Sequence, residues 1–323
     1  MKVLVTGANG FLGSHVVERL LRSNHDVTAL IRPASKPPCW SGKVRIFKID
    51  LRAPSGLEDA LQGIDTVVHV AAATSGTEDM QFASTVGGTE KLLAAMAKSG
   101  VRRLVHISSF VVYDWAHAGR TLDESTPLET AIYGMGGYAI AKFWQERIVL
   151  RHAEQNNCKT VILRPGFIWG AGHAEISGMG RSFGRLFMVI SPANVLPLTH
   201  VRNCADCIGA AVEADLPSGE VFNVVDKFKV STWGYTGDVL KGSKKRAWRF
   251  PVPYWLGMAV ARGASAASVR RFGPRGQLPS LLAKRRFQAQ FRPLHFSTSK
   301  LTRVLKWTPP LSYRQCLEET FPE

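Results

Sequence analysis

Residues 6–13 of the chain are Thr-Gly-Ala-Asn-Gly-Phe-Leu-Gly, and this stretch is the most informative part of the sequence. It follows the strand-like apolar run Val3–Thr6 and leads directly into Phe11–Arg22, where apolar residues recur at helical spacing. In such a turn the first glycine permits a tight bend, the second lets a pyrophosphate approach the backbone, and the third allows close helix–strand packing. The N–H groups and the dipole at the start of the helix attract the anion. The spacing predicts a dinucleotide-binding loop that contains Gly7, Asn9, Gly10, Phe11, Leu12 and Gly13.

Strand-like and helical segments alternate through the first half of the chain, which predicts βαβ units and a parallel sheet with helices on both faces. The alternation stops after Pro165, and one more strand is expected near Val221. We therefore expect an α/β fold, a Rossmann-type doubly wound parallel sheet with a smaller C-terminal substrate-binding lobe. Residues 1–165 would form the NAD(P)-binding domain, 195–225 would return to it, and 166–194 and 226–323 would form the lobe. The expected strands are Val3–Thr6, Val27–Ile31, Val44–Ile49, Thr66–Ala71, Leu104–Ile107, Thr160–Leu163 and Val221–Val224, and the expected helices are Phe11–Arg22, Val86–Ser99 and Tyr138–Asn156.

The composition is that of an ordinary globular protein. Hydrophobic residues make up 45% and charged residues 20% of the 323 residues, and the mean hydropathy is −0.02. This balance excludes wholesale disorder and a multi-span membrane protein. The N-terminal residues lack the long apolar core of a signal peptide, and an odd number of cysteines, five, suggests reduced thiols. We therefore expect a cytoplasmic protein.

The net charge of +16 is concentrated in one region. The 79 residues 239–317 contain 17 Lys or Arg and no Asp or Glu, so the other 24 Lys and Arg nearly balance all 25 Asp and Glu. Three partners fit such a region: an anionic membrane surface, a nucleic acid or a phosphorylated substrate. The first of these would make the protein peripheral at the membrane. A basic face exposed to solvent, with no specific partner, is the fourth interpretation.

The residues after the second expected strand bear on the choice of cofactor. An acidic residue about 20 positions beyond the glycine loop would bind the ribose 2′-hydroxyl of NAD. This chain has Arg32 there, with Ser35 and Lys36 nearby. A cation matches the 2′-phosphate of NADP, so Arg32 and Lys36 favour NADP(H), with NAD(H) as the alternative. Arg32 could also be a surface arginine with no role in cofactor binding.

A candidate catalytic pair begins the last of the expected helices. Tyr138 and Lys142 are four residues apart, so their side chains share one helix face. A neighbouring ammonium would lower the pKa of the phenol, and Tyr138 could then exchange a proton with an alcohol or carbonyl oxygen. Ser108 and Ser109 follow the fifth expected strand, and one of their hydroxyls could hold the reacting oxygen.

These segments together resemble the extended short-chain dehydrogenase/reductases, the NAD-dependent epimerase/dehydratase family, over essentially the whole chain. The ordered motifs are specific for fold and cofactor but much less so for substrate. They are Thr6–Gly13, Val68-His-Val-Ala-Ala72, Ile107-Ser-Ser-Phe-Val-Val-Tyr113, Tyr138-x-x-x-Lys142, Leu163-Arg-Pro-Gly166 with Gly170, His200-Val-Arg-Asn203, Gly219-Glu-Val-Phe-Asn223 and Leu305-Lys-Trp307.

The resemblance implies a role for each matching position. Ser109, Tyr138 and Lys142 would be the catalytic residues, with Ser108 as the alternative serine, and Lys142 would also hold the nicotinamide ribose. By the same analogy, two copies of the chain could pair into a dimer. The other implied cofactor contacts are Asp50 and Leu51 at the adenine, Val70, Ala71 and Ala73 at the adenosine and pyrophosphate, and Pro165 and Ile168 at the nicotinamide.

The chain departs from the family pattern at two positions. Thr85 replaces a common asparagine, which puts a supporting hydrogen bond in doubt, and Asp114 replaces the glycine that usually follows the Val-Tyr pair.

The segment beginning at Arg292 looks closest to the 3β-hydroxysteroid dehydrogenase-like and 2-alkyl-3-oxoalkanoate reductase branch. This resemblance implies hydride transfer between the nicotinamide and an apolar ketone or secondary alcohol. The alternative function is that of a nucleotide-sugar epimerase, but those enzymes usually have an acidic residue where this chain has Arg32. Residues expected to line an apolar substrate pocket are Phe110, Phe167, Trp169, Met179, Phe183 and Trp255.

Three further features complete the sequence-based expectations. A non-catalytic nucleic-acid-binding protein on the same fold is the second alternative, but it would have no need of Tyr138 and Lys142. The apolar stretch Pro251–Ala267 is expected to form a helix that caps the substrate pocket rather than a membrane insert. Cys204 and Cys207 have metal-ligand spacing but no second pair near them in sequence, so no metal is expected.

Overall fold

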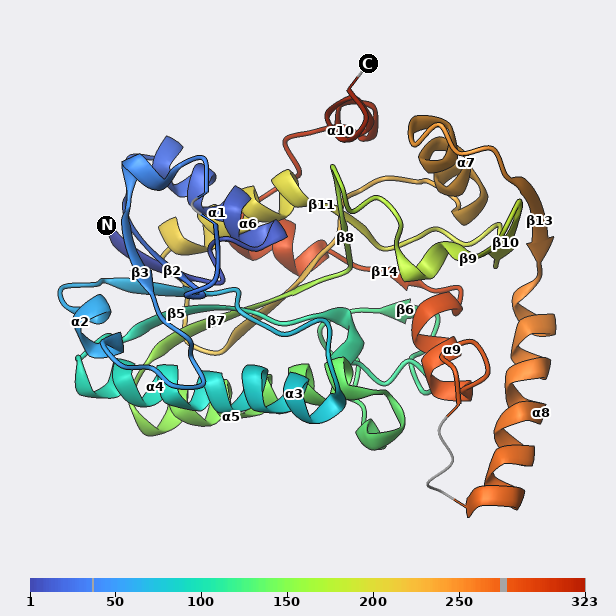
Figure 1. Ribbon diagram of the computed structural model, residues 1–323, viewed down its shortest axis with the longest axis horizontal. Coiled ribbons are helices and arrows are strands. Elements are labelled where there is room, and N and C mark those ends of the chain that lie inside the picture. Colours follow the sequence, from blue (N-terminus) through green and yellow to red (C-terminus); the bar gives the residue numbers. More distant parts are fainter. Residues whose placement is uncertain (37, 274–277, 323) are drawn as a thin grey trace.

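A computed structural model describes residues 1–36, 38–273 and 278–322, and its core is a seven-stranded, all-parallel sheet (Figure 1). The strand order is β12-β7-β5-β4-β1-β2-β3, which confirms the doubly wound Rossmann-type fold. The strands are β1 (Lys2–Thr6), β2 (Asp26–Ile31), β3 (Arg45–Lys48), β4 (Thr66–His69), β5 (Arg103–Ile107), β7 (Lys159–Pro165) and β12 (Glu220–Val224).

The central strands are apolar at nearly every position because helices cover both faces of the sheet. In β1, Val3 and Val5 point into the core beneath α1 (Phe11–Arg22) and α6 (Val201–Glu213), and Leu4 points into the opposite core. Figure 1 shows α1 and α6 on one side of the sheet and α4 and α5 on the other. The helices of that second side are α2 (Leu57–Leu61), α3 (Glu78–Phe82), α4 (Gly88–Lys98) and α5 (Gly137–Gln155).

A smaller lobe is built from short strands and helices beside the carboxyl end of the sheet (Figure 1). Three small sheets, β13-β10-β9, β11-β8 and β14-β6, organise this part of the chain. The sequence pattern did not reveal these strands because most of them mix exposed with buried or half-buried residues and lack the continuous apolar runs of the central strands. They are β6 (Thr121–Leu122), β8 (Phe167–Trp169), β9 (Gly180–Phe183), β10 (Leu186–Ile190), β11 (Leu198–His200), β13 (Trp248–Val252) and β14 (His295–Phe296), and the helices are α7 (Thr232–Gly242), α8 (Tyr254–Phe272), α9 (Lys284–Phe291) and α10 (Tyr313–Thr320).

The chain passes from the main sheet into the smaller lobe, returns to the sheet, and then enters the lobe a second time. It leaves after β7, returns through β11 and α6 to β12, and leaves for the second time after Val224. The two crossings lie side by side, because the Gly166 N–H donates to the Val224 carbonyl at 3.1 Å. The smaller lobe is therefore joined to the sheet by two adjacent outgoing segments and by the return through β11 and α6.

The apolar stretch beginning at Pro251 forms a helix, but the helix starts at Tyr254 and continues to Phe272. Among the described residues, no helix is both long enough and apolar enough to cross a bilayer. The five cysteines are free thiols, and Cys204 and Cys207 lie in the core between α6 and the sheet.

Candidate functional site

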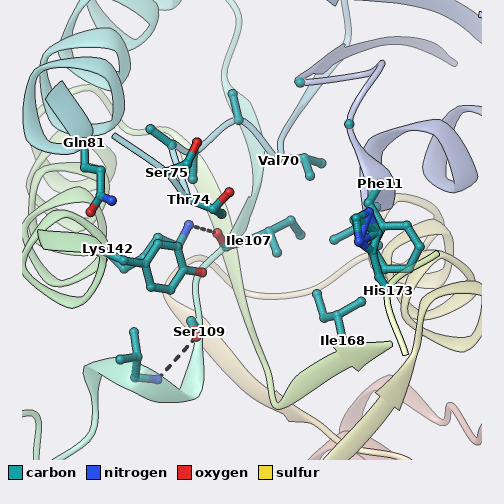
Figure 2. A pocket seen from close by; sticks show the side chains of 18 of the residues that line it. Phe11, Val70, Thr74, Ser75, Gln81, Ile107, Ser109, Lys142, Ile168 and His173 are labelled. Carbon is teal, nitrogen blue, oxygen red and sulfur yellow. Dashed lines mark hydrogen bonds between the residues drawn. The ribbon is translucent and has the colours of Figure 1, made fainter. Parts of the chain in front are cut away.

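A pocket of about 1920 Å³ opens along the carboxyl ends of β1, β4, β5 and β7, where ligands bind in open α/β sheets. Figure 2 shows Ser109 and Lys142 toward one end and Phe11 and His173 toward the other. The volume exceeds that of a typical single-ligand pocket, so the space fits a dinucleotide together with a second molecule.

The glycine loop has the geometry that a pyrophosphate requires. Gly7 lies in the left-handed region at φ +65°, and its carbonyl accepts from the Gly10 N–H at 2.9 Å. A Cβ added to Gly13 would lie 2.1 Å from the Gly7 oxygen, so only glycine lets the helix begin this close to the loop. Gly10 caps α1 without a side-chain hydrogen bond, which leaves N–H groups of the first turn available to an anion. The residues therefore fit a dinucleotide.

The end of the pocket beyond β2 and β3 is rich in arginine. Arg32 and Arg52 both line it, and Arg52 donates to the Asp50 carboxylate at 2.7 Å. Arg52 and, more weakly, Arg32 lower the pKa of Asp50. Lys36 does not line the pocket, contrary to the sequence-based expectation; its side chain is exposed, and its carbonyl accepts from the Asn9 amide at 3.0 Å.

The two candidate serines occupy different environments. The Ser108 side chain is buried and donates to Glu146, whose carboxylate also pairs with the buried Arg164. Ser109 lines the pocket, and its hydroxyl oxygen accepts from the Val111 N–H at 3.3 Å, a contact drawn in Figure 2. Ser108 is therefore committed to the protein interior, whereas Ser109 faces a ligand.

Tyr138 stands in the first turn of α5 and lines the pocket beside Ser109. Two glycines precede it: Gly136 has φ +89°, and the Gly137 N–H donates to Glu78 at 3.1 Å. A Cβ on Gly137 would lie 2.8 Å from the Cα of Glu78, so these glycines allow α3 to pack against the start of α5. Burial raises the pKa of the Tyr138 phenol, and the Ser109 hydroxyl offsets part of that rise.

Lys142 lies one turn after Tyr138 and is buried. Its ammonium donates to the Ile107 carbonyl at 2.5 Å and to Gln145 Oε1 at 2.6 Å, which leaves one N–H for a ligand. Burial lowers the pKa of Lys142 to about 7, while the nearby Glu146 carboxylate acts in the opposite direction. The sequence predicts that Lys142 lowers the pKa of Tyr138, but the two influences on this phenol are its burial, which raises the pKa, and the Ser109 hydroxyl, which lowers it.

A buried network connects Lys142 to the glycine loop. The Gln145 amide nitrogen lies within hydrogen-bond distance of Thr89 at 2.9 Å and of His69 Nε2 at 3.1 Å, and His69 Nδ1 lies 2.7 Å from the hydroxyl of Thr6. Burial lowers the pKa of His69 to about 3, so the imidazole is neutral. The network therefore adds no positive charge beside Lys142.

The departures at positions 85 and 114 both have structural explanations. Thr85 Oγ1 accepts from the Ala73 N–H at 3.0 Å, so the threonine supports the loop after β4. The buried Asp114 carboxylate accepts from the backbone N–H groups of Ala116 and His117 at 2.9 and 3.2 Å, and thereby closes a turn.

The structure brings nearly all the predicted site residues to one pocket. Besides Ser109, Tyr138 and Lys142, the lining contains Gly7, Asn9, Gly10, Phe11, Leu12, Gly13, Arg32, Asp50, Leu51, Val70, Ala71, Ala73, Pro165 and Ile168.

The prediction of the apolar substrate pocket was only partly correct. Phe110 and Phe167 line the pocket, but Trp169 and Met179 belong to a core cluster of the smaller lobe. Phe183 and Trp255 are exposed on the outer surface and are absent from the described lining. The expectation that α8 caps the pocket is also wrong: none of its described residues lines the pocket, and α9 contributes to the wall instead. The lining residues that the sequence did not reveal include Arg52, Thr74, Ser75, Gln81, Trp115, Met135, Arg286, Ala289 and Gln290.

Comparisons with known proteins agree with this geometry. A model of the NAD dependent epimerase/dehydratase family matches residues 3–224. The chain is 28% identical to a 3 beta-hydroxysteroid dehydrogenase/Delta 5-->4-isomerase of Mycobacterium tuberculosis, over 99% of this chain and 90% of that protein. It is 32% identical to a 2-alkyl-3-oxoalkanoate reductase of Stenotrophomonas maltophilia, over 67% of each chain.

A solved structure shows the same fold. The UDP-glucose 4-epimerase of Thermus thermophilus in complex with NAD superimposes with a TM-score of 0.71, covering 99% of this chain and 98% of that one. The sequence identity is 23%, so the likeness concerns the fold.

The different environments of the two serines lead to opposite expectations for their alanine variants. Ser108→Ala should lower the free energy of unfolding by about 1–3 kcal/mol, because the buried Glu146 carboxylate loses a donor. Ser109→Ala should lower it by less than about 1 kcal/mol, since its contact with the Val111 N–H is long and lies at the pocket surface. Urea unfolding measures both, and equal losses would contradict the assignment of Ser108 to the interior.

Proposed function

The chain belongs to the NAD dependent epimerase/dehydratase family, and we propose that it is an NADP(H)-dependent reductase that converts an apolar ketone to a secondary alcohol. The observation that carries the proposal is the grouping of Ser109, Tyr138 and Lys142 at one end of the pocket. A phenol placed beside Ser109 can donate its proton to the oxygen of a bound carbonyl group during reduction.

Each of the three residues has a distinct task in this proposal. Ser109 hydrogen-bonds to the carbonyl oxygen and fixes its position, and Tyr138 donates the proton as the oxygen gains negative charge. Lys142 keeps its ammonium next to the reacting groups through Ile107 and Gln145, and its remaining N–H is available to a ribose hydroxyl. A bound nicotinamide supplies the hydride to the carbonyl carbon.

The walls near Ser109 favour an apolar substrate over a nucleotide sugar. Phe110, Val111, Trp115, Met135 and Ala289 contribute apolar surface to the pocket.

The neighbouring cations already have protein partners. Arg286 donates to the Gly134 carbonyl at 3.1 Å and lies 3.8 Å from Glu78. Arg292 is bonded to the carbonyls of the loop that contains Trp115. A sugar diphosphate would need cations that are free, whereas a steroid-like or β-keto lipid ketone would not. The relatives named as a steroid dehydrogenase and an oxoalkanoate reductase point to the same substrate class.

The arginines at the adenosine end support the choice of NADP. Arg32 and Arg52 line the pocket there; the Asp50 carboxylate is hydrogen-bonded to Arg52, and its pKa is also lowered by the charge of Arg32. The 2′-phosphate of NADP would add negative charge to a region with an excess of positive charge.

The decisive variant is Tyr138→Phe, which removes only the hydroxyl that donates the proton. With a panel of β-keto lipids, steroid ketones and nucleotide sugars, the wild-type protein should oxidise NADPH in the presence of an apolar ketone. The variant should lose at least about a hundredfold in kcat but bind NADPH nearly as tightly. Near-ultraviolet absorbance follows turnover, and fluorescence titration follows binding.

Two results would contradict the reductase. Substantial turnover by Tyr138→Phe would remove the proton donor from the mechanism. Conversion of a nucleotide sugar to its isomer without net NADPH oxidation would establish an epimerase instead.

Cofactor selectivity depends on Arg32 in this proposal. Arg32→Ala should weaken NADPH binding by roughly tenfold to a hundredfold, the range for loss of one charge-assisted hydrogen bond, and should leave NADH binding almost unchanged. Titration of the protein with each dinucleotide measures the ratio. The control is Arg45→Ala, an exposed arginine of β3 outside the described pocket lining. An equal loss for both dinucleotides would refute the role of Arg32.

The lowered pKa of Lys142 predicts a pH dependence. In the free protein the ammonium loses its proton as pH rises through about 7, so kcat/KM for NADPH should fall above that pH. Lys142→Arg should be slower but should lose this alkaline decline, because a guanidinium stays charged. Rates measured between about pH 6 and 9 test this expectation, and an unchanged profile in the variant would assign the decline to another group.

A further inference from the structure

Helix α8 stands at the edge of the smaller lobe, directly after β13 and far from the α1–α6 side of the sheet (Figure 1). One side of it packs inward: Met258 and Ala261 are buried in a cluster with Phe287 and Phe291 of α9. The opposite side faces away from the protein. Helix α8 is thus attached to the lobe along a single stripe.

The outward side of α8 is apolar, which is the reverse of an ordinary surface helix. Trp255 is 70% exposed, Leu256 43% and Val260 54%. Ala259, Ala266 and Ala267 are also exposed. We call these six residues the outer face of α8. Such contiguous exposed apolar surface marks a site of association.

A second apolar row crosses the small sheet β13-β10-β9, whose strand β13 leads into this helix. Leu186 of β10 is paired with both Trp248 of β13 and Phe183 of β9, so the three side chains form one row across the small sheet. They are 50%, 79% and 57% exposed, respectively. Exposed aromatic residues therefore continue beyond the N-terminal end of α8.

The charges on α8 are all positive. Arg262, Arg270 and Arg271 are exposed, and α8 contains no Asp or Glu. None of the three has an ion-pair partner within the described parts of the chain. Only some of the other cations that the structure describes in residues 239–317 are paired, and these are Lys245 with Glu175, Arg285 with Glu129, Arg286 with Glu78, Lys300 with Glu220 and Arg314 with Glu318. The α8 arginines differ from the remaining cations in lying beside the exposed apolar residues of the same helix.

We propose that α8 docks the protein on an anionic membrane surface. Its outer face would enter the boundary between headgroups and acyl chains, and Arg262, Arg270 and Arg271 would lie among the lipid phosphates. A nucleic acid would satisfy the arginines but would leave Trp255 and Leu256 without an apolar partner. A second copy of the chain would cover the apolar residues but would bring the arginines of both copies together with no acidic residue of α8 between them.

The position of α8 gives this docking a direct relation to the pocket. Helix α9 contributes Arg286, Ala289 and Gln290 to the pocket wall, and Phe287 and Phe291 of the same helix lie in one cluster with α8. A membrane bound at α8 would therefore lie one helix layer away from the pocket. The docking itself is independent of the reaction proposed above, and its test measures binding alone.

Vesicle sedimentation tests the charge component. The full chain should bind phosphatidylcholine vesicles that contain phosphatidylglycerol and should bind pure phosphatidylcholine vesicles far more weakly. The variant Arg262→Gln/Arg270→Gln/Arg271→Gln should bind anionic vesicles more than about tenfold more weakly. The matched control Lys43→Gln/Arg45→Gln/Lys48→Gln removes three exposed cations beside and within β3 and should bind like the wild type. Equal binding to both vesicle types, or equal losses in the two variants, would overturn the proposal.

Two further variants test the apolar component. Trp255→Gln/Leu256→Gln should weaken binding by about tenfold or more, because the arginines alone give shallow association. The variant Trp255→Phe should still bind anionic vesicles. Brominated lipid in those vesicles should quench a smaller fraction of its tryptophan emission than in the wild type, because the membrane-inserted tryptophan is absent. The control is Trp40→Phe, which removes a 3%-exposed tryptophan and should leave the quenched emission of the exposed residues in place. Circular dichroism confirms that each variant is folded.

The alternative partners give distinct results that would each overturn membrane docking. A dimer in analytical ultracentrifugation that Trp255→Gln/Leu256→Gln dissociates would make α8 an interface between two copies. Oligonucleotide binding that exceeds vesicle binding, and that depends on the three arginines but not on Trp255 and Leu256, would make it a nucleic-acid surface.

Discussion

The contact between Gly13 and the carbonyl of Gly7 is the constraint on which the site depends. A methyl group at position 13 would lie 2.1 Å from that oxygen, so α1 can begin at Phe11 only because the side chain is absent. The early start of the helix directs its uncapped N–H groups into the space above β1 and β4. The shape of the pocket at this end and the exposure of these N–H groups to it depend on this one close approach.

A second set of interactions connects that loop to the groups proposed for catalysis. The chain of contacts from Lys142 through Gln145 and His69 to Thr6 is buried and neutral apart from the ammonium itself. Arg164 and Glu146 form a separate buried ion pair, with Arg164 4.7 Å from the centre of the Tyr113 ring. Removing one partner of such a pair is costly, which gives the region between β5, β7 and α5 little freedom to change.

The sequence was sufficient to predict the main sheet because its strands are continuous apolar runs and its glycines have strict geometric roles. It was also sufficient for most of the pocket, since parallel strands bring residues such as Ala71 and Pro165 to one edge. It could not distinguish Ser108 from Ser109, because the difference is made by Glu146, 38 residues later in the chain. It also misplaced Trp255 and Trp169, since aromatic composition alone does not reveal which side of a short strand or helix faces the pocket. The wall made by α9 was missed because it depends on how the smaller lobe folds back.

The return of the chain to the main sheet has a consequence for synthesis on the ribosome. Strand β12 pairs with β7, but it is made only after β8 to β11 and α6. Until residues 220–224 emerge, the apolar strand β7 is an unprotected sheet edge. The nascent chain must therefore keep this edge from pairing with other strands while part of the smaller lobe is already being made.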